Sequence, residues 1–368
     1  MIGPAVLAAS LGLGIPDPAP RFPVEASERA VVWNGFDQAW TYNHRLSRLG
    51  NYVGGVRCDG LACVADAVRA AATGSGSDRA TFRSQVTSVT AAGVGFLQGA
   101  TRFRVHDERG EGATVHLSRT QSVPARGLLA DRDQLHVLLG GFDMRAVADP
   151  DKLARLSMAV SDPRYDAADD VIRFDVGLTV RLDCDSAECD AFDRSVDYDV
   201  SVVWTLLAAD DEVAVTNRSS AVDYAWGNAR RSPELDPAQF VERASLAGAP
   251  DLFQSAFVAF RSLSVDLDDD HHVQAWSTAI RPGAYDPLSG SHVFELAMLF
   301  KQWNALSRAR LLSFSERGDA SISCDLALVQ LRGGTVVPQE LSGELGWRAK
   351  GGPADPALSQ RVQQVRVR

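Results

Sequence analysis

The stretch LARLSMAVSDPRYDAADDVIRFDVGLTV (Leu153–Val180) has a counterpart 120 residues later, VQAWSTAIRPGAYDPLSGSHVFELAMLF (Val273–Phe300). The two segments align without a gap, and where residues differ, apolar side chains mostly face apolar ones. Each of the two segments has the residue pattern of two strands that flank a turn rich in Asp, Gly and Pro. The identical residues are Ser157/Ser277, Ala159/Ala279, Tyr165/Tyr285, Asp166/Asp286 and Phe174/Phe294.

A weaker echo of the same pattern lies near the N-terminus. WNGFD (Trp33–Asp37) matches LGGFD (Leu139–Asp143), and HRLSRLGNYV (His44–Val53) falls on DKLARLSMAV (Asp151–Val160) after a one-residue change in spacing. We interpret the three regions as divergent copies of one strand-rich module. The alternative is a chance likeness between short strands and turns in a chain rich in Ala, Val and Asp.

Length and composition indicate a globular protein built from several packed units. The chain has 368 residues, of which 45% are hydrophobic and 23% are charged. Alternating apolar and polar residues with frequent turn signals predict a mainly β fold of antiparallel β-sandwich units. We expect few short helices, at Leu61–Ala72, which is Ala-rich, and at Asp236–Ala247, where Asp236 and Pro237 suit a helix start.

The composition also predicts boundaries along the chain. The expected order is an N-terminal arm at 1–25, β unit 1 at 26–125, β unit 2 at 126–235, a linker at 236–250, β unit 3 at 251–350, and a basic tail at 351–368.

The net charge of −10 disfavours nucleic acid and anionic membrane surfaces, because both select Lys- and Arg-rich partners. No apolar run is long enough to predict a membrane span. The apolar stretch Ile2–Ile15 lacks a preceding Lys or Arg, so it is not a convincing signal peptide. Cytoplasmic and exported locations both stay open.

The sharpest polar cluster is DLDDDHHV (Asp266–Val273), which combines carboxylates with two imidazoles. Such groups bind divalent metals, so the sequence offers a candidate calcium or zinc site, although no cofactor is required by any motif. A solvated turn between two strands is the alternative interpretation. The candidate ligands are Asp266, Asp268, Asp270, His271 and His272.

Four of the five cysteines form two pairs with the same spacing, Cys58/Cys63 and Cys184/Cys189. Each pair could close a local disulfide, the two pairs together could bind zinc, or all four could stay reduced. Cys324 lies in an alternating strand and is expected to be buried.

Aromatic residues near predicted loops are candidates for stacking on sugar rings, and core packing is the alternative for each. They are Trp40, Tyr42, Trp226, Tyr285 and Trp303. In the repeated Tyr-Asp pairs at 165–166 and 285–286, we expect the Asp to cap a turn through backbone N–H groups and the Tyr to pack over the sheet end.

The sequence contains no phosphate-binding loop, no nucleophile elbow and no HExxH zinc motif, and no motif is specific enough to name a family. We therefore expect a non-enzymatic structural or binding protein that acts through self-assembly or a protein partner. A carbohydrate-binding protein of the lectin type, assisted by metal or not, is the first alternative. A metal-dependent hydrolase is the second.

Overall fold

A computed structural model shows that the chain is built from antiparallel β-sheets. Every regular element in the described residues is a strand and every strand pair is antiparallel, which confirms the predicted mainly β class. In this part of the chain, no helix is long and apolar enough to cross a membrane. The structure describes residues 27–41, 48–49, 55–59, 62–66, 72–73, 76–107, 114–125, 128, 134–146, 152–183, 196–210, 213–225, 238–247, 255–267, 271–286, 288, 291–304 and 319–349.

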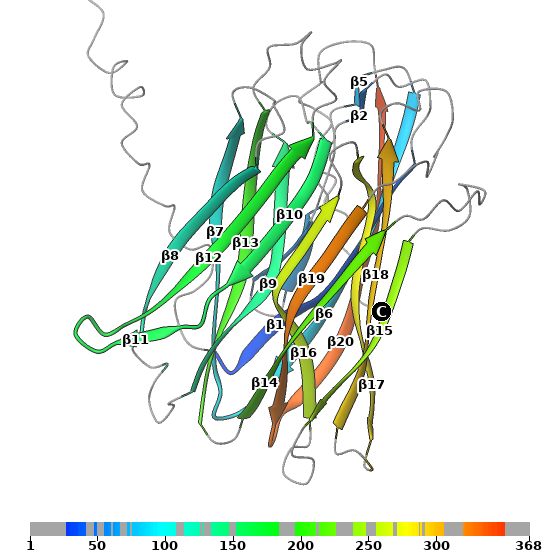
Figure 1. Cartoon of the computed structure of the whole chain (residues 1–368). Helices are drawn as coiled ribbons and strands as arrows, with labels where there is room; N and C mark the ends of the chain where they lie inside the picture. The colour runs from blue at the N-terminus through cyan, green and yellow to red at the C-terminus, as the bar shows by residue number, and fades with distance from the viewer. Residues whose placement is uncertain are drawn as a thin grey trace, which may run out of the picture.

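The long strands run side by side in three sheets (Figure 1). The six-stranded sheet has the order β15 (Ala238–Ala247), β18 (Ser291–Asn304), β17 (His271–Asp286), β1 (Arg29–Thr41), β6 (Gly76–Thr90), β20 (Thr335–Ala349). The seven-stranded sheet has the order β11 (Arg164–Asp166), β12 (Val171–Asp183), β10 (Lys152–Val160), β16 (Ser255–Leu267), β19 (Asp319–Leu331), β14 (Val213–Ala225), with β8 (Thr114–Pro124) also paired to β12. The three-stranded sheet has the order β7 (Gly95–Asp107), β13 (Val196–Ala209), β9 (Gln134–Ala146).

Two small ladders complete the described strands. One joins β2 (Arg48–Leu49) to β5 (Ala72–Thr73), and the other joins β3 (Gly55–Asp59) to β4 (Ala62–Asp66). β3 also contacts β9, at the edge of the three-stranded sheet.

The hairpins that carry the aligned segments have the same strand register. Adding 120 to each residue number of the β10–β12 register gives the β17–β18 register. Both registers skip one residue at the same place, Ala154 in β10 and Gln274 in β17. An earlier strand pairs with the far side of each hairpin, β8 with β12 and β15 with β18. The sequence alignment and the hydrogen-bonded register therefore agree residue by residue.

A second strand pair recurs three times, and each occurrence contains a β-bulge. The pairs are β1–β6, β9–β13 and β16–β19, and their registers skip Asn34, Gly140 and Arg261 respectively. A bulge adds one residue to one strand and bends it, so the bulge residue is a reference point from which the three strand pairs can be aligned. Asn34 and Gly140 are the residues that the WNGFD and LGGFD alignment had placed together.

The sheets also share one order of strands. In the six-stranded sheet, β1 and β6 lie between the β17–β18 hairpin and β20. In the seven-stranded sheet, β16 and β19 lie in the same places between the β10–β12 hairpin and β14. The three-stranded sheet repeats the last three places of this order with β9, β13 and β7. Each sheet thus joins strands that are far apart in the sequence.

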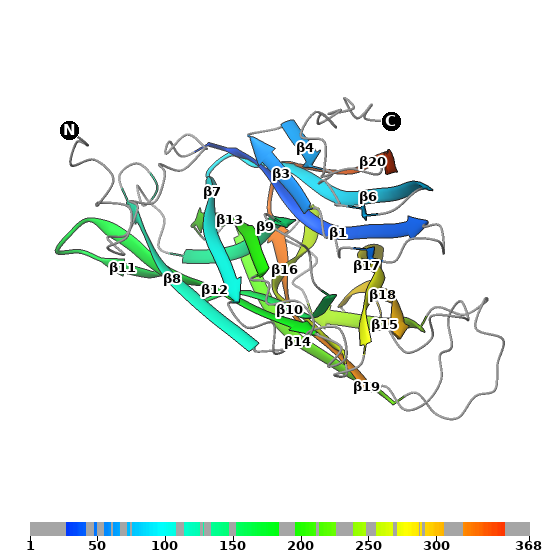
Figure 2. The same cartoon turned by 90° about the horizontal axis from the view of Figure 1, so that it is seen from above.

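β1, β9 and β16 contact one another in the interior of the molecule, as the view from above shows (Figure 2). On one side of these strands, Trp33 packs against Phe142 and Phe260, with ring centroids 5.6 Å and 4.9 Å away. On the other side lies a second buried cluster, which includes Val32, Leu138 and Ala259, each two residues before its bulge. Burial of both faces of these strands places the core between the three sheets.

The two segments expected to be helical contain strands instead. β4 lies within 61–72 and β5 begins at Ala72, while β15 lies within 236–247 and pairs with β18 along its length. Helix propensity is a weak local preference, and pairing with a neighbouring strand overrides it here. The predicted unit boundaries and the three-copy interpretation are not decided by these pairings and stay predictions.

Candidate functional site

The bulge of β1 places Asn34 at a junction between two sheets. The side chain is 7% exposed, and its Nδ2 donates a hydrogen bond to the carbonyl oxygen of Val258 in β16. The hydroxyl of Thr87 in β6 donates to Asn34 Oδ1. A buried amide is destabilising unless its donors and acceptors are paired, and here both ends have a partner. Asn34 therefore ties the β1–β6 pair to β16.

The equivalent bulge residue of β9 is Gly140, and a side chain from another strand supplies the amide there. Gln98 of β7 is 8% exposed, and its Nε2 lies 2.7 Å from the carbonyl oxygen of Val31 and 3.0 Å from Thr205 Oγ1. A Cβ on Gly140 would lie 3.1 Å from Thr205 Oγ1. A side chain at this bulge would therefore crowd the Thr205 hydroxyl that Gln98 bonds.

The partners at these two junctions occupy equivalent positions. Val31 and Val258 each lie three residues before the bulge of their strand. Thr87 lies opposite Val32, two residues before one bulge, and Thr205 lies opposite the residue two before the next bulge. The same pair of groups, a valine carbonyl and a threonine hydroxyl, is thus bridged by an amide at both junctions.

The third bulge residue, Arg261 of β16, makes a charged junction. Its guanidinium forms an ion pair with Asp162, between β10 and β11, and its side chain is 17% exposed. His136 of β9 lies near both groups. Burial, and then the positive charge of Arg261, lower the pKa of His136, whereas Asp162 opposes the shift. Within the described part of the chain, His136 Nε2 is buried without a hydrogen-bond partner.

Of the candidate metal ligands, Asp266 is the one whose side chain the structure describes, and it is held by two arginines. Its oxygens lie 3.2 Å from Arg155 Nη1 in β10 and 3.2 Å from Arg181 Nη2 in β12. Its neighbour Val265 is buried, as the expected alternation requires. A carboxylate engaged by two guanidinium groups has fewer lone pairs left for a cation.

The other candidate ligands lie beyond the end of β16. Asp268 and Asp270 fall outside the described residues, and His271 and His272 open β17. Among the described side chains, no group of three His, Cys, Asp or Glu residues is arranged to hold a metal ion. The proposed metal site at 266–272 stays a prediction.

Part of the aromatic set gathers at one end of the six-stranded sheet. Trp303 in β18 lies opposite His272 in β17, and Trp40 lies at the same end of β1, one residue beyond the Ala39–Ala275 pair. Tyr285 lies at the opposite end of the β17–β18 hairpin. Tyr42 and Trp226 fall outside the described residues.

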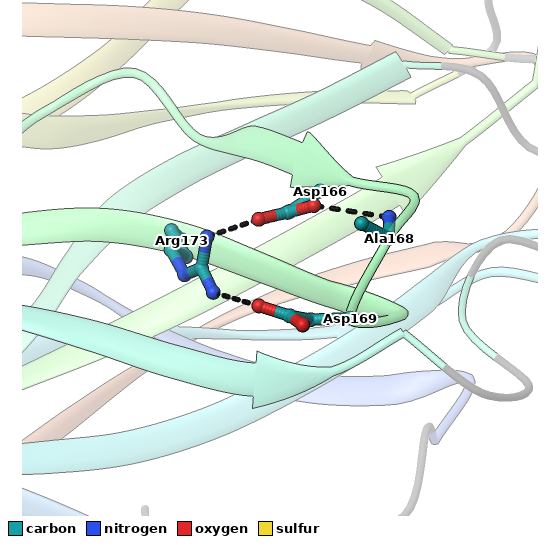
Figure 3. Close-up of polar contacts among 4 residues, drawn as sticks. All are labelled: Asp166, Ala168, Asp169 and Arg173. Carbon is teal, nitrogen blue, oxygen red and sulfur yellow. Dashed lines mark hydrogen bonds and ion pairs between the residues drawn. The ribbon is translucent and has the colours of Figure 1, made fainter.

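The Tyr-Asp pair at 165–166 forms the tip of the β11–β12 hairpin, which projects from one end of the molecule in Figure 1. Asp166 accepts a hydrogen bond of 3.0 Å from the backbone N–H of Ala168, which confirms the predicted turn cap. Its other oxygen pairs with Arg173, which also binds Asp169 (Figure 3). The Ala168 N–H, followed by Arg173, lowers the pKa of Asp166.

The structure places the hydroxyl of Tyr165 within the turn, and its predicted packing over the sheet end stays a prediction. Its hydroxyl lies 3.1 Å from Asp170 Oδ1, while 46% of the residue is exposed. This hydrogen bond, with burial and the nearby carboxylates, raises the pKa of Tyr165. Each of the three carboxylates at the hairpin tip, on Asp166, Asp169 and Asp170, thus has a partner within the β11–β12 hairpin.

The structure describes three of the five cysteines, Cys58, Cys63 and Cys324. Cys58 and Cys63 lie directly opposite each other in the β3–β4 ladder. Cys184 and Cys189 fall outside the described residues. Cys324 is 2% exposed, which confirms its predicted burial.

Comparisons of the chain with protein-family models, with curated proteins and with solved structures find no match.

The junction residues were missed by reasoning from the sequence. Asn34, Gly140 and Arg261 occupy one structural position but differ in chemistry, so no shared motif marks them. The aligned WNGFD and LGGFD segments did place Asn34 beside Gly140. A Gly opposite an Asn in two such aligned strands is the signal that could have predicted a bulge.

Proposed function

We propose that the chain is a non-enzymatic structural component in which three fused copies of one module take the place of a trimer of identical subunits. The observation that carries this proposal is the threefold recurrence of a bulged strand pair, in β1–β6, β9–β13 and β16–β19. Closed assemblies of identical subunits repeat the same contacts at each interface. Here equivalent contacts recur within one chain.

The exchange of strands between the proposed copies supports a role in building a stable framework. β7 pairs with β13, β14 with β19, and β20 with β6, so a strand from each copy completes the sheet of the next. The exchange includes all three copies, because β20 of the third copy pairs with β6 of the first. Such an arrangement couples all three modules in one cooperative core.

Fusion also allows the three junctions to differ. One is bridged by Asn34, one by Gln98 and one by the Arg261–Asp162 ion pair. A trimer of identical subunits would have three equal junctions and three equal outer surfaces. A fused chain can instead present unequal surfaces to its neighbours, which suits a component that binds copies of itself or a protein partner in a fixed orientation.

The proposal is tested by the mass of the purified chain in solution, measured by light scattering with and without a chelator. We expect discrete particles that contain two or more copies of the 39.6 kDa chain and whose mass does not change on chelation. Asp266→Asn should leave this mass unchanged, because Asp266 pairs with Arg155 and Arg181 of the same chain. A monomer that neither assembles nor captures a protein from its own cell extract would contradict the proposal.

Carbohydrate binding is the second candidate, favoured by the placement of Trp40, His272 and Trp303 at one end of the six-stranded sheet. Aromatic rings beside polar groups suit sugar rings. The test is a glycan panel probed with the native chain, Trp303→Ala and, as a control far from that end, Tyr285→Ala. Binding that Trp303→Ala removes and Tyr285→Ala preserves would favour this function over assembly.

A further inference from the structure

Cys58 and Cys63 occupy directly opposed positions in the β3–β4 ladder. The register runs from the Gly55–Asp66 pair through Cys58–Cys63 to Asp59–Ala62. Two residues of sequence, Gly60 and Leu61, connect the ladder ends. Because the side-chain period of a strand is two residues, directly opposed residues share one face of a hairpin.

The pair also falls at the favourable kind of site within the ladder. A two-residue connection is closed by a hydrogen-bonded pair, here Asp59–Ala62, and the pairs then alternate along an antiparallel ladder. Cys58–Cys63 is therefore a non-hydrogen-bonded pair, in which the Cα atoms are typically about 4.5 Å apart. That separation lies within the range of about 4.4–6.8 Å found for disulfides.

A covalent link between its strands would stabilise this short hairpin more than it would stabilise the longer ones. β3 and β4 have five residues each, and a lone two-stranded hairpin of this size is marginally stable. β3 contacts β9, so the hairpin lies at the edge of the three-stranded sheet. We propose that Cys58 and Cys63 form a disulfide that closes the β3–β4 hairpin.

The reaction needs an external disulfide, and oxidised glutathione is the simplest member of that class. The thiolate of one cysteine attacks the glutathione disulfide, forms a mixed disulfide and releases one glutathione thiolate. The thiolate of the other cysteine then attacks the protein sulfur of the mixed disulfide and releases the second glutathione. The two protein thiols lose two electrons and two protons, and one glutathione disulfide is reduced to two thiols.

Trypsin separates the cysteines cleanly, so the pairing can be read from the full-length chain. Cleavage after arginine gives Cys58–Arg69, which holds this pair alone, Leu182–Arg194 with Cys184 and Cys189, and Gly318–Arg332 with Cys324. The native chain is equilibrated in glutathione buffers, quenched, denatured and alkylated before digestion and mass spectrometry. We expect Cys58–Arg69 without alkyl groups and two hydrogens lighter than its reduced form, and with two alkyl groups after reduction.

Variants connect the bond to the stability of the protein. Reductant should lower the melting temperature of the native chain, and Cys58→Ala combined with Cys63→Ala should remove that response. The matched control, Cys184→Ala with Cys189→Ala, should keep it. Two alkyl groups on Cys58–Arg69 in every oxidising buffer would overturn the proposal. So would a cross-link to Leu182–Arg194, or stoichiometric zinc that the first double variant loses.

Discussion

Gln98 fulfils at one junction the role that Asn34 fulfils at another. Each side-chain amide is buried, each donates to the carbonyl oxygen of a valine three residues before a bulge, and each bonds a threonine hydroxyl on the paired strand. Asn34 extends from the bulge itself, whereas Gln98 comes from β7 and bonds Thr205, whose hydroxyl lies next to Gly140. The same valine and threonine positions are thus bonded at both junctions, although Asn34 Oδ1 accepts from Thr87 whereas Gln98 Nε2 donates to Thr205.

Removing the Asn34 amide should destabilise the fold measurably. In Asn34→Ala the hydroxyl of Thr87 and the carbonyl of Val258 lose a buried partner, so we expect a loss of about 2–3 kcal/mol in the free energy of unfolding. Urea denaturation measures it. Thr120→Ala, which removes an exposed hydrogen bond to Asp175, is the control and should change stability by less than about 0.5 kcal/mol. Equal effects of the two substitutions would contradict the assigned role.

The equivalence of the junctions predicts a rescue. Gln98→Ala should destabilise the chain by about 2–3 kcal/mol, because Val31 and Thr205 lose their buried amide partner. Adding Gly140→Asn should recover part of that loss, since an Asn at this bulge reproduces the Asn34 arrangement. In the native background the same Gly140→Asn should be destabilising, because its side chain would crowd Val203 and the Thr205 hydroxyl that Gln98 already bonds. A double-mutant cycle in urea checks the sign, and additive losses would refute the equivalence.

The sequence predicted local pairing better than it predicted the assembly of the sheets. Alignment of Leu153–Val180 with Val273–Phe300 anticipated two hairpins of equal register, because side-chain alternation and turn residues act within a short span. The pairing of β1 with β17 and of β10 with β16 joins distant segments. Those contacts depend on the shared core, which no short pattern encodes.

The errors in secondary structure have the same origin. The Ala-rich segment 61–72 has a local preference for helix, and the strands β4 and β5 form there because partners are available. The capped turn at Asp166 was predictable because its acceptor and donor are two residues apart. The ion pairs of Asp266 were not, since Arg155 and Arg181 come from other strands.

Gly99 is required by the ring that covers it. A Cβ at this position would overlap the indole of Trp204, which is buried and donates from Nε1 to Thr101 Oγ1 at 3.2 Å. We expect Gly99→Ala to destabilise the chain by about 1–3 kcal/mol through overpacking. Gly333→Ala is the matched control, because a Cβ there meets nothing within 4 Å. Thermal unfolding should separate the two, and similar melting temperatures would argue against the close packing of Trp204.

The ion pairs of Asp266 should matter more than any metal at that position. In Asp266→Asn, Arg155 and Arg181, which lie opposite each other in β10 and β12, lose the carboxylate between them. All three side chains are partly exposed, so we expect a loss of only about 1 kcal/mol, and a smaller one at high salt. Denaturation at two salt concentrations measures it. A native chain that a chelator destabilises, and an Asp266→Asn variant that it does not, would instead support a metal site.

The charged junction should make stability depend on pH through His136. Burial and Arg261 hold the folded-state pKa of His136 below its ordinary value of 6.5, so the unfolded chain binds the proton more readily. The stability contributed by the neutral imidazole is therefore complete well above pH 6.5 and is lost as the pH falls through 6.5 toward the lower folded-state pKa.

His136→Phe tests this assignment. Phe257 occupies the equivalent place in β16, because His136 and Phe257 each lie four residues before the bulge residue of their strand. We expect the variant to show a flatter stability profile between neutral and mildly acidic pH, measured by urea denaturation at each pH. His116→Gln, at an exposed histidine bonded to Thr179, is the control and should keep the native profile. If His136→Phe keeps the native slope, the assignment of the pH dependence to His136 is wrong.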